Sequence, residues 1–269
     1  MREIDYSGYE HILVERRGEV LTVTMNRPDQ LNAIDHALHE ELGQIFTDVA
    51  RDDRTSVAIL TGAGRAFSAG GDIKAMMRHA DETGKPGHYI DMSTAKRIIY
   101  SMLDLEKPLI AKVNGVAIGL GATLALMCDL TYMADHAKIG DPHVTAGVVA
   151  GDGSAIIWPQ LIGFARAKEY LMTGEALDAR TAEAIGLVNH AVKAEALDAV
   201  VNKMADRLAQ GPREAIRWTK VSVNVALRQL AHSMLDTSLA YEMLTMRSPS
   251  HAEAICAFTE GRKPDFARR

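Results

Sequence analysis

Cysteine is scarce in this chain, which has two cysteines, Cys128 and Cys256, among its 269 residues. Both lie in apolar, helix-like surroundings, so the sequence offers neither a disulfide framework nor a cysteine-based metal site. We expect two reduced, buried thiols instead. Histidines such as His36 and His39 show no ligand spacing with carboxylates, so no metal is expected, and these two are predicted to be surface residues.

Positive charge is also in short supply. The 30 Lys and Arg residues are outnumbered by 35 Asp and Glu residues, so the formal net charge is −5. This balance argues against a nucleic-acid partner. Long apolar runs are lacking as well, and the first residues, MREIDYSGYEH, are too polar and acidic for a secretory signal. We therefore expect a cytoplasmic enzyme without a membrane partner.

The chain does contain an alternation of strand and helix patterns, and its length is within reach of one large α/β unit. Strands and helices alternate as far as Ile139. A glycine-punctuated loop is predicted over 141–154. From there the pattern is almost entirely helical, without strands, and ends with helices predicted over 213–227, 230–246 and 252–259. A polar loop is predicted over 81–87. No linker or internal repeat separates the two parts.

The stretch 114–129, NGVAIGLGATLALMCD, joins a predicted strand over 109–113 to a helix whose apolar spacing begins at Leu120. The first N–H groups of a helix have no partner inside the helix and carry partial positive charge. Glycines let a ligand approach such a backbone closely. The stretch is therefore either a device for tight helix packing or a site for an oxygen that becomes anionic during a reaction.

A second glycine-rich loop, RAFSAGGD over 65–72, also follows a strand and leads into a helix. Its Ser68 and Ala69 are small enough for their N–H groups to face a ligand. If the two loops lie side by side, two N–H groups can converge on one carbonyl oxygen as an oxyanion hole, in which each donor is typically worth about 3 to 4 kcal/mol. Neither loop matches a nucleotide-binding fingerprint.

Several motifs together resemble the enoyl-CoA hydratase/isomerase (crotonase) superfamily. They are RAFSAGGDI, VNGVAIGLGATLALMCDL, Asn-Arg-Pro at 26–28 with Leu-Asn-Ala at 31–33, and the tail AFTEGRKPDF over 257–266. The resemblance covers nearly the whole chain. It implies a ClpP-like spiral of ββα units over residues 1–194 and a helical region over 195–269 that mediates trimerisation, often as a dimer of trimers.

The same resemblance implies a coenzyme A thioester as the substrate, with no other cofactor. The thioester carbonyl would be held by the N–H groups of Ala69 and Leu120. The CoA-binding edge would be lined by Ala69, Gly70, Gly71, Asp72 and Ile73. Candidates for contact with the CoA phosphates are Arg27, Arg262 and Lys263.

The residues that carry the chemistry depart from the hydratases of this family, in which two glutamates flank the substrate and deliver water and a proton. Thr123 and His143 occupy these two positions here. The spacing of His143 and Asp152 resembles the 6-oxocamphor hydrolase branch, which cleaves β-diketones, and Glu242 matches a glutamate of that branch. Leu120, however, stands where that branch has a histidine.

Three functions are therefore open. The first is a lyase, isomerase or hydrolase that acts on an acyl-CoA through His143, Asp152 and Glu242. The second is a C–C bond hydrolase of a β-diketone that works by a retro-Claisen reaction without CoA. The third is a non-catalytic member of the family that binds acyl-CoA.

Overall fold

The chain winds as a spiral in which each turn contributes strands to two sheets. The computed structural model describes residues 2–83 and 91–267. The large sheet contains, in spatial order, β1 (Ile12–Arg17), β2 (Val20–Met25), β3 (Val57–Gly62), β5 (Leu109–Val113), β7 (Leu130–Ala134) and β10 (His190–Val192). The small sheet contains β4 (Ala66–Ser68), β6 (Val116–Ile118), β8 (Lys138–Gly140) and β9 (Leu177–Asp178). The predicted α/β spiral is therefore confirmed.

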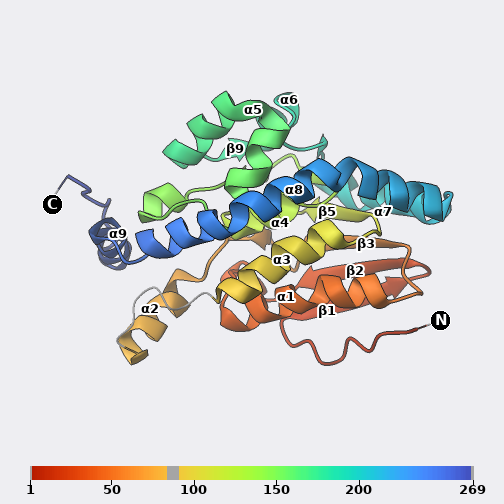
Figure 1. The fold of residues 1–269 in the computed structure, drawn as a ribbon, viewed down its shortest axis with the longest axis horizontal. Helices are drawn as coiled ribbons and strands as arrows, with labels where there is room; N and C mark the ends of the chain where they lie inside the picture. The colour runs from red at the N-terminus through yellow and green to blue at the C-terminus, as the bar shows by residue number, and fades with distance from the viewer. Residues whose placement is uncertain (1, 84–90, 268–269) are drawn as a thin grey trace.

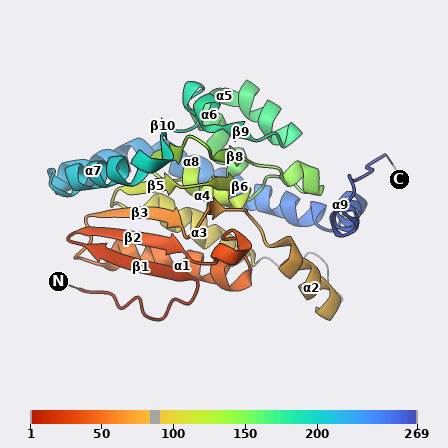
Figure 2. The ribbon, with the colours of Figure 1, turned by 180° about the vertical axis from the view of Figure 1, so that it is seen from behind.

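The strands of the large sheet are parallel except for the β1–β2 hairpin. Parallel strands are usually covered on both faces, and β3 is accordingly buried along its whole length. One face carries α1 (His36–Arg51) and α3 (Met92–Asp104), over which α8 (Arg213–Thr245) is laid (Figure 1). The other face is covered in part by α7 (Leu197–Ala209), as can be followed in Figure 2, which views the molecule from the side opposite to Figure 1.

The remaining helices gather around the ends of the small-sheet strands. They are α2 (Ile73–Thr83), α4 (Leu120–Leu126), α5 (Ser154–Thr173), α6 (Ala179–Ala184) and α9 (Pro249–Glu260), with short 3-10 helices η1 (Pro28–Gln30), η2 (His143–Ala146) and η3 (Ala194–Ala196). Helices α2 and α9 lie at one end of the molecule, together with the C-terminal end of α8 (Figure 1). The active-site candidates lie near this end.

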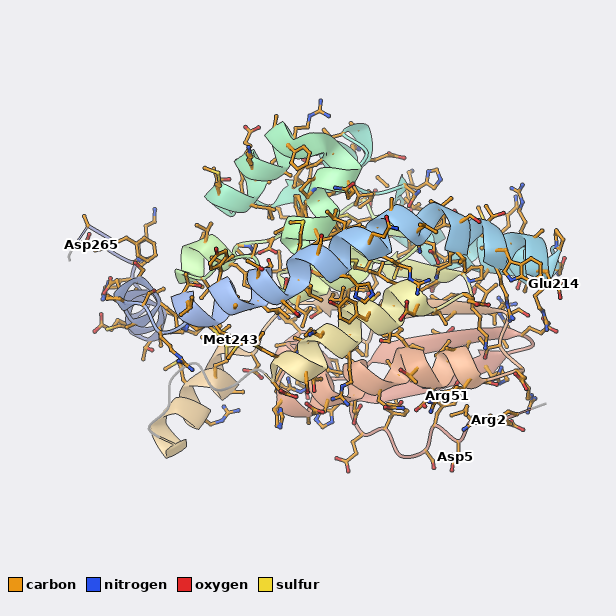
Figure 3. The ribbon with its side chains drawn as sticks, in the orientation of Figure 1. Arg2, Asp5, Arg51, Glu214, Met243 and Asp265 are labelled. Atoms are coloured by element: carbon orange, nitrogen blue, oxygen red, sulfur yellow. The ribbon has the colours of Figure 1, made fainter. Side chains whose placement is uncertain are left out.

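Helix α8 spans the molecule, as the labels Glu214 and Met243 near its two ends show in Figure 3. Ion pairs hold it against the rest of the molecule, and two of them illustrate this. Lys220 Nζ lies 2.7 Å from Asp129 Oδ2, and Asp236 Oδ1 lies 2.7 Å from Lys96 Nζ on α3. The helix is therefore fixed both along its length and in rotation.

The two glycine loops lie side by side, as the sequence predicts, because β4 and β6 pair in parallel. Gly70 in the first loop has a φ of +82°, and a Cβ atom there would come within 2.6 Å of the Ile118 carbonyl oxygen. Gly119 in the second loop has a φ of +56° and caps α4. Residues with side chains rarely adopt such angles, so glycine is required where the loops meet.

The second half of the chain differs from the prediction in three ways. The absence of strands was wrong, because β9 and β10 form there and β10 pairs with β7. The helices predicted over 213–227 and 230–246 form one helix, α8. Cys128 is a buried free thiol as predicted, but Cys256 is exposed on α9.

Two further predictions concern the segment after α2 and the assembly. Helix α2 continues to Thr83, and the rest of the polar loop predicted over 81–87 lies outside the described residues. Phe164, Met172 and Val223 expose apolar side chains on α5 and α8. Such surfaces suit the homo-oligomer that the sequence predicts, and the trimer or hexamer stays a prediction, as does the division at residue 194.

Candidate active site

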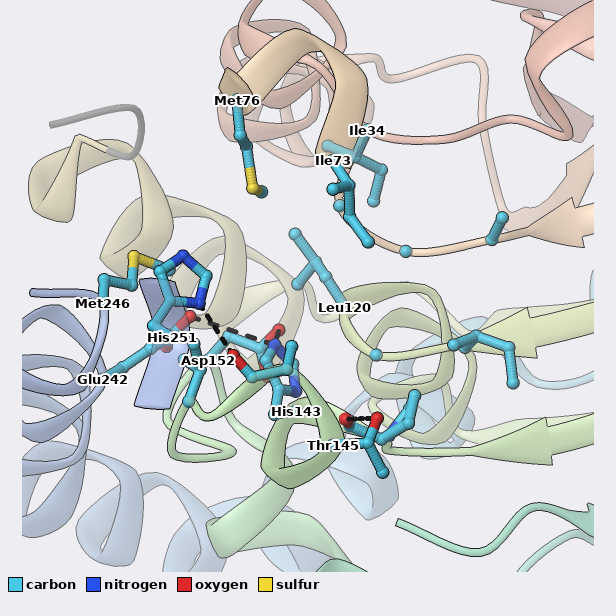
Figure 4. A pocket seen from close by; sticks show the side chains of 18 of the residues that line it. Ile34, Ile73, Met76, Leu120, His143, Thr145, Asp152, Glu242, Met246 and His251 are labelled. Carbon is cyan, nitrogen blue, oxygen red and sulfur yellow. Dashed lines mark hydrogen bonds and ion pairs between the residues drawn. The ribbon is translucent and has the colours of Figure 1, made fainter. Parts of the chain in front are cut away.

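A cavity of about 200 Å³ opens where the two glycine loops face the C-terminal end of α8. Gly71 of the first glycine loop lines it. It is also lined by Leu120 from the second loop, Ile73 and Met76 from α2, and His251 from α9 (Figure 4). The elements come from distant parts of the sequence. The cavity is therefore a product of the spiral rather than of any one segment.

Among the backbone N–H groups at this cavity, those of Gly71 and Leu120 have no hydrogen-bond acceptor among the described residues. Gly71 pairs with Ile34 in an isolated bridge whose bonds run through the neighbouring residues: the Ile34 N–H donates to Gly70 O, and the Asp72 N–H donates to Ile34 O. The Gly71 N–H has no part in these bonds. Both N–H groups can therefore donate a hydrogen bond to a ligand oxygen.

This geometry corrects the prediction that the Ala69 N–H is one of the oxyanion donors. Its N–H donates to the carbonyl oxygen of Leu31 at 3.0 Å, so the donor is already used within the protein. Ala69 still lines the cavity, as do Gly70 and Ile73. The predicted role of Leu120 stays a prediction, and its N–H is free for it.

His143 lies at the start of η2, directly after the Gly-Asp-Pro turn, and its ring is held by Asp141. The Asp141 carboxylate contacts Nδ1 of His143 and also accepts the His143 backbone N–H at 3.1 Å. Asp141 is almost completely buried. Because the Nδ1 side of the ring is occupied, Nε2 is the nitrogen that is turned toward the other ionisable groups.

Two further carboxylates face that second nitrogen. Asp152 Oδ2 lies 3.6 Å from His143 Nε2, and Glu242 Oε1 lies 3.9 Å from the same atom (Figure 4). Asp152 precedes α5, and Glu242 is carried by α8. The structure thus brings together His143, Asp152 and Glu242, the three predicted catalytic residues, around one point of the cavity wall.

Burial and mutual charge shift the pKa values of this cluster in different directions. Burial raises the pKa of Asp152 to about 6, against the opposing effect of the His143 charge. Burial and then the Asp152 charge raise the pKa of Glu242 to about 8. Burial alone would lower the pKa of His143, but Asp141, Asp152 and Glu242 together raise it well above its ordinary value. Near neutral pH the cluster therefore holds a histidinium, an ionised Asp152 and a protonated Glu242.

Thr123 lies behind this cluster rather than in the cavity wall. It is fully buried, and its hydroxyl donates to Asp152 Oδ1 at 3.1 Å and lies 2.9 Å from Ser154 Oγ. The residue at the first glutamate position of the hydratases thus orients the carboxylate of Asp152. This contact leaves the second oxygen of Asp152 turned toward His143.

The residues predicted to contact CoA phosphates lie outside the set that lines this cavity. Arg27 forms ion pairs with Asp35 and Asp72, at 2.9 and 3.2 Å. Arg262 pairs with Glu253 at 2.5 Å and also with Glu260. Asp72 is buried and accepts the Ala75 N–H at the start of α2, and Lys263 is exposed. Phosphate binding by any of these basic residues stays a prediction.

The same cluster contains potential metal ligands. Ligand atoms of Asp141, His143 and Asp152 lie within 4.8 Å of one another. Nδ1 of His143 is in direct contact with the Asp141 carboxylate, whereas Oδ2 of Asp141 has no hydrogen-bond partner among the described residues. The absence of a metal therefore stays a prediction.

Three residues of the site were not singled out from the sequence. Asp141 could have been found from the turn chemistry, because an aspartate often accepts the N–H two residues on. His39 was predicted to be at the surface, but it is 6% exposed and lines the cavity. It shares a face of α1 with Leu42 and Phe46, at helical spacing, which was the available signal. His251 lies on α9, where its Nδ1 is 2.7 Å from the carbonyl oxygen of Ala146.

Comparisons with known proteins agree with this architecture. The family model described as enoyl-CoA hydratase/isomerase matches residues 15–269. The chain is 36% identical to a probable enoyl-CoA hydratase of Mycobacterium tuberculosis, over 97% of this chain and 99% of the relative. It is 34% identical to 1,2-epoxyphenylacetyl-CoA isomerase of Escherichia coli, over 96% of this chain and 98% of the relative.

A solved structure, an enoyl-CoA hydratase/isomerase from Mycobacterium paratuberculosis, superposes with a TM-score of 0.86 at 33% identity, covering 93% of this chain and 99% of that one. Within the described residues, no helix has the length and apolar character needed to cross a membrane. The family model and these relatives cover nearly all of the chain, and the chain belongs to the enoyl-CoA hydratase/isomerase family.

Proposed function

We propose that this protein is an enzyme that binds an acyl-CoA thioester and adds water to it by acid–base catalysis. The thioester carbonyl would accept hydrogen bonds from the N–H groups of Gly71 and Leu120. The family implies the CoA ester, and the names of relatives such as the isomerase of Escherichia coli refer to CoA compounds. The proposal rests above all on the convergence of Asp152 and Glu242 on His143 Nε2 beside those two donors.

The two carboxylates would have opposite roles because their pKa values differ. Asp152, ionised above about pH 6, would take a proton from water. The water oxygen would form a bond to the β-carbon of an α,β-unsaturated acyl group, the π bond of the double bond would break, and its electron pair would place negative charge on the thioester oxygen as an enolate. Glu242, protonated below about pH 8, would give its proton to the α-carbon as the carbonyl re-forms.

His143 would connect the two steps. A histidinium between two carboxylates stabilises the ionised Asp152 and can pass the proton taken from water on to Glu242, which restores the starting state. The raised pKa of His143 favours this role over that of a general base. Asp141 would keep the ring oriented by holding its Nδ1 side.

The C–C bond hydrolase stays the second candidate. Arg27 and Arg262, expected to bind CoA phosphates, are neutralised by neighbouring carboxylates, so a substrate without CoA is not disfavoured on their account. The same groups would then act on a β-diketone. Asp152 would activate water for attack on a ketone carbon, the C–C bond would break, and Glu242 would protonate the leaving enolate.

Thermal unfolding and turnover test the proposal. A CoA ester should raise the Tm, whereas a stabilisation by cyclic β-diketones and by no CoA species would favour the second candidate. Asp152→Asn and Glu242→Gln should each lower kcat by about 10² to 10⁴, while Asp198→Asn, at an exposed aspartate, should not. Crotonyl-CoA hydration should be slower than in a two-glutamate hydratase, because Thr123 and His143 stand at the two glutamate positions and the carboxylates of Asp152 and Glu242 act from other positions.

The pH profile gives an independent check. Turnover should require ionised Asp152 and protonated Glu242, so kcat/KM should be bell-shaped, with apparent limbs near pH 6 and pH 8 that belong to the coupled cluster. Unchanged rates in both variants, or a flat profile, would contradict the mechanism. Tight CoA-ester binding without turnover of any ester would point to the non-catalytic alternative.

A further inference from the structure

His39 lines the cavity and has no part in the proposed acid–base chemistry. It comes from α1, whereas the catalytic cluster comes from η2, α8 and the segment before α5. Its neighbours along the cavity wall include the apolar Ile34 and Ala95. The wall it occupies is therefore otherwise suited to a hydrocarbon chain.

The imidazole of His39 lacks a partner although it is 94% buried. Neither ring nitrogen forms a hydrogen bond with a described residue, and neither is sealed off from open space. Once a ligand fills the cavity and encloses these nitrogens, they cost free energy unless the ligand is hydrogen-bonded to them. The two nitrogens thus offer unused hydrogen-bonding capacity to whatever fills the cavity.

His39 is also electrically neutral. Burial lowers its pKa to about 4, and the charged groups that modify this value are Glu40, His36, Asp91 and Arg97, which lie outside the catalytic cluster. A neutral imidazole carries one N–H donor and one acceptor nitrogen. It therefore matches an uncharged oxygen group, such as a hydroxyl or a ketone, better than a carboxylate or an ammonium group.

We infer that His39 selects acyl groups that carry a second oxygen function, a hydroxyl or a keto group, beyond the thioester carbonyl. This inference rests on the proposed function and names the substrate class of the same cavity. A plain alkyl chain would fill the wall and leave the imidazole without a partner. An oxygenated chain would fill the same space and satisfy it, so the discrimination comes from the penalty on the wrong substrate.

Binding measurements with saturated CoA esters test this inference, since these esters are not turned over. The ligands are hexanoyl-CoA and its 4- and 5-hydroxy and 4- and 5-oxo analogues, titrated calorimetrically into the wild type. At least one oxygenated ester should bind about tenfold more tightly than hexanoyl-CoA, the difference expected for one buried hydrogen bond. Comparison of hydroxy with oxo esters identifies which oxygen group is preferred.

Variants of the same helix assign the preference to His39. His39→Leu should abolish it and bind hexanoyl-CoA at least as tightly as the wild type does. His39→Gln, which keeps a donor and an acceptor, should retain part of it. His36→Leu makes the same replacement at an exposed histidine of α1 and should leave the preference unchanged.

Two results would overturn the inference. One is equal affinity of the wild type for hexanoyl-CoA and for all four oxygenated esters. The other is a preference that survives in His39→Leu. Failure of the proposed function looks different, because then no CoA ester would bind to any of the four proteins, and the inference would fall with it.

Discussion

Two buried carboxylates, Asp52 and Glu242, have opposite surroundings. Asp52, at the end of α1, is fully buried and accepts hydrogen bonds from the Tyr6 hydroxyl at 2.9 Å and the Thr55 hydroxyl at 3.0 Å, and it forms an ion pair with Arg16. Glu242, on α8, is equally hidden, yet its Oε2 has no hydrogen-bond partner among the described residues.

The pKa values follow from this difference. Burial alone would raise the pKa of Asp52, but the donated hydrogen bonds outweigh it and hold the pKa below its ordinary value. Burial raises the pKa of Glu242 to about 8, because no donor offsets it. A carboxylate with all its acceptors used holds the fold together, whereas one with an unused oxygen keeps a proton that can be transferred.

Removing the charge of Asp52 should give the largest loss of stability. Asp52→Asn leaves Arg16 and two hydroxyls without their charged acceptor, so the free energy of unfolding should fall by about 3 kcal/mol. The turnover of the folded fraction should not change. Denaturant titration and kcat per folded molecule measure the two effects, and Asp53→Asn, at the exposed neighbour, should shift stability by less than about 0.5 kcal/mol. An inactive but stable Asp52→Asn protein would contradict the comparison.

Glu242→Gln should have a smaller effect on stability, and one of opposite character. An unfolded glutamate loses its proton near pH 4.5, while the native one keeps it to about pH 8. Between these values the native state binds more protons, so the wild type loses stability as pH rises from about 4.5 to 8. Glutamine cannot ionise, so the variant should lose less stability over this range.

Each 1 kcal/mol of this difference corresponds to about 2 to 4 °C in Tm. Thermal unfolding at pH 5, 7 and 8.5 measures it. Glu214→Gln, at the exposed end of the same helix, is the matched control and should keep the wild-type slope. A steeper loss of stability in Glu242→Gln than in the wild type would refute the raised pKa.

The smallest change is expected for Asp141→Asn, which keeps an acceptor for the ring of His143 but removes its negative charge. An adjacent opposite charge typically shifts a pKa by about one to three units, so the pKa of His143 should fall by at least about one unit. NMR titration of the ring protons measures it. The stability that this histidine contributes at low pH should then be lost at a lower pH in the variant. An unchanged His143 titration would exclude Asp141 as the positioning residue.

The sequence predicts those parts of this molecule whose structure depends on residues close together in the chain. The strand–glycine–helix order around Leu120 and the conformational demands of Gly119 are visible in a dozen residues. The burial of Glu242 is much harder to predict from the sequence, because which face of α8 is buried depends on the elements that pack against it. The spiral and the three residues proposed to be catalytic, His143, Asp152 and Glu242, followed from the resemblance.

The errors have one common source, which is pairing over long distances. The resemblance implies Ala69 as a donor, but its N–H donates to the carbonyl oxygen of Leu31. β10 is three residues long and is a strand because it pairs with β7. His39 is predicted to be at the surface because it shows no ligand spacing with carboxylates, whereas it lines a cavity to which α3 and α8 also contribute residues.

The continuity of α8 sets a limit on how this protein can change. Lys220 fixes the helix at one point through Asp129, and Glu242 must reach the cavity 22 residues further on. One inserted or deleted residue between them would turn Glu242 by about 100° around the helix axis. It would thereby remove the glutamate from the histidine without touching either side chain. The site can therefore tolerate substitutions in this segment of α8, but not insertions or deletions.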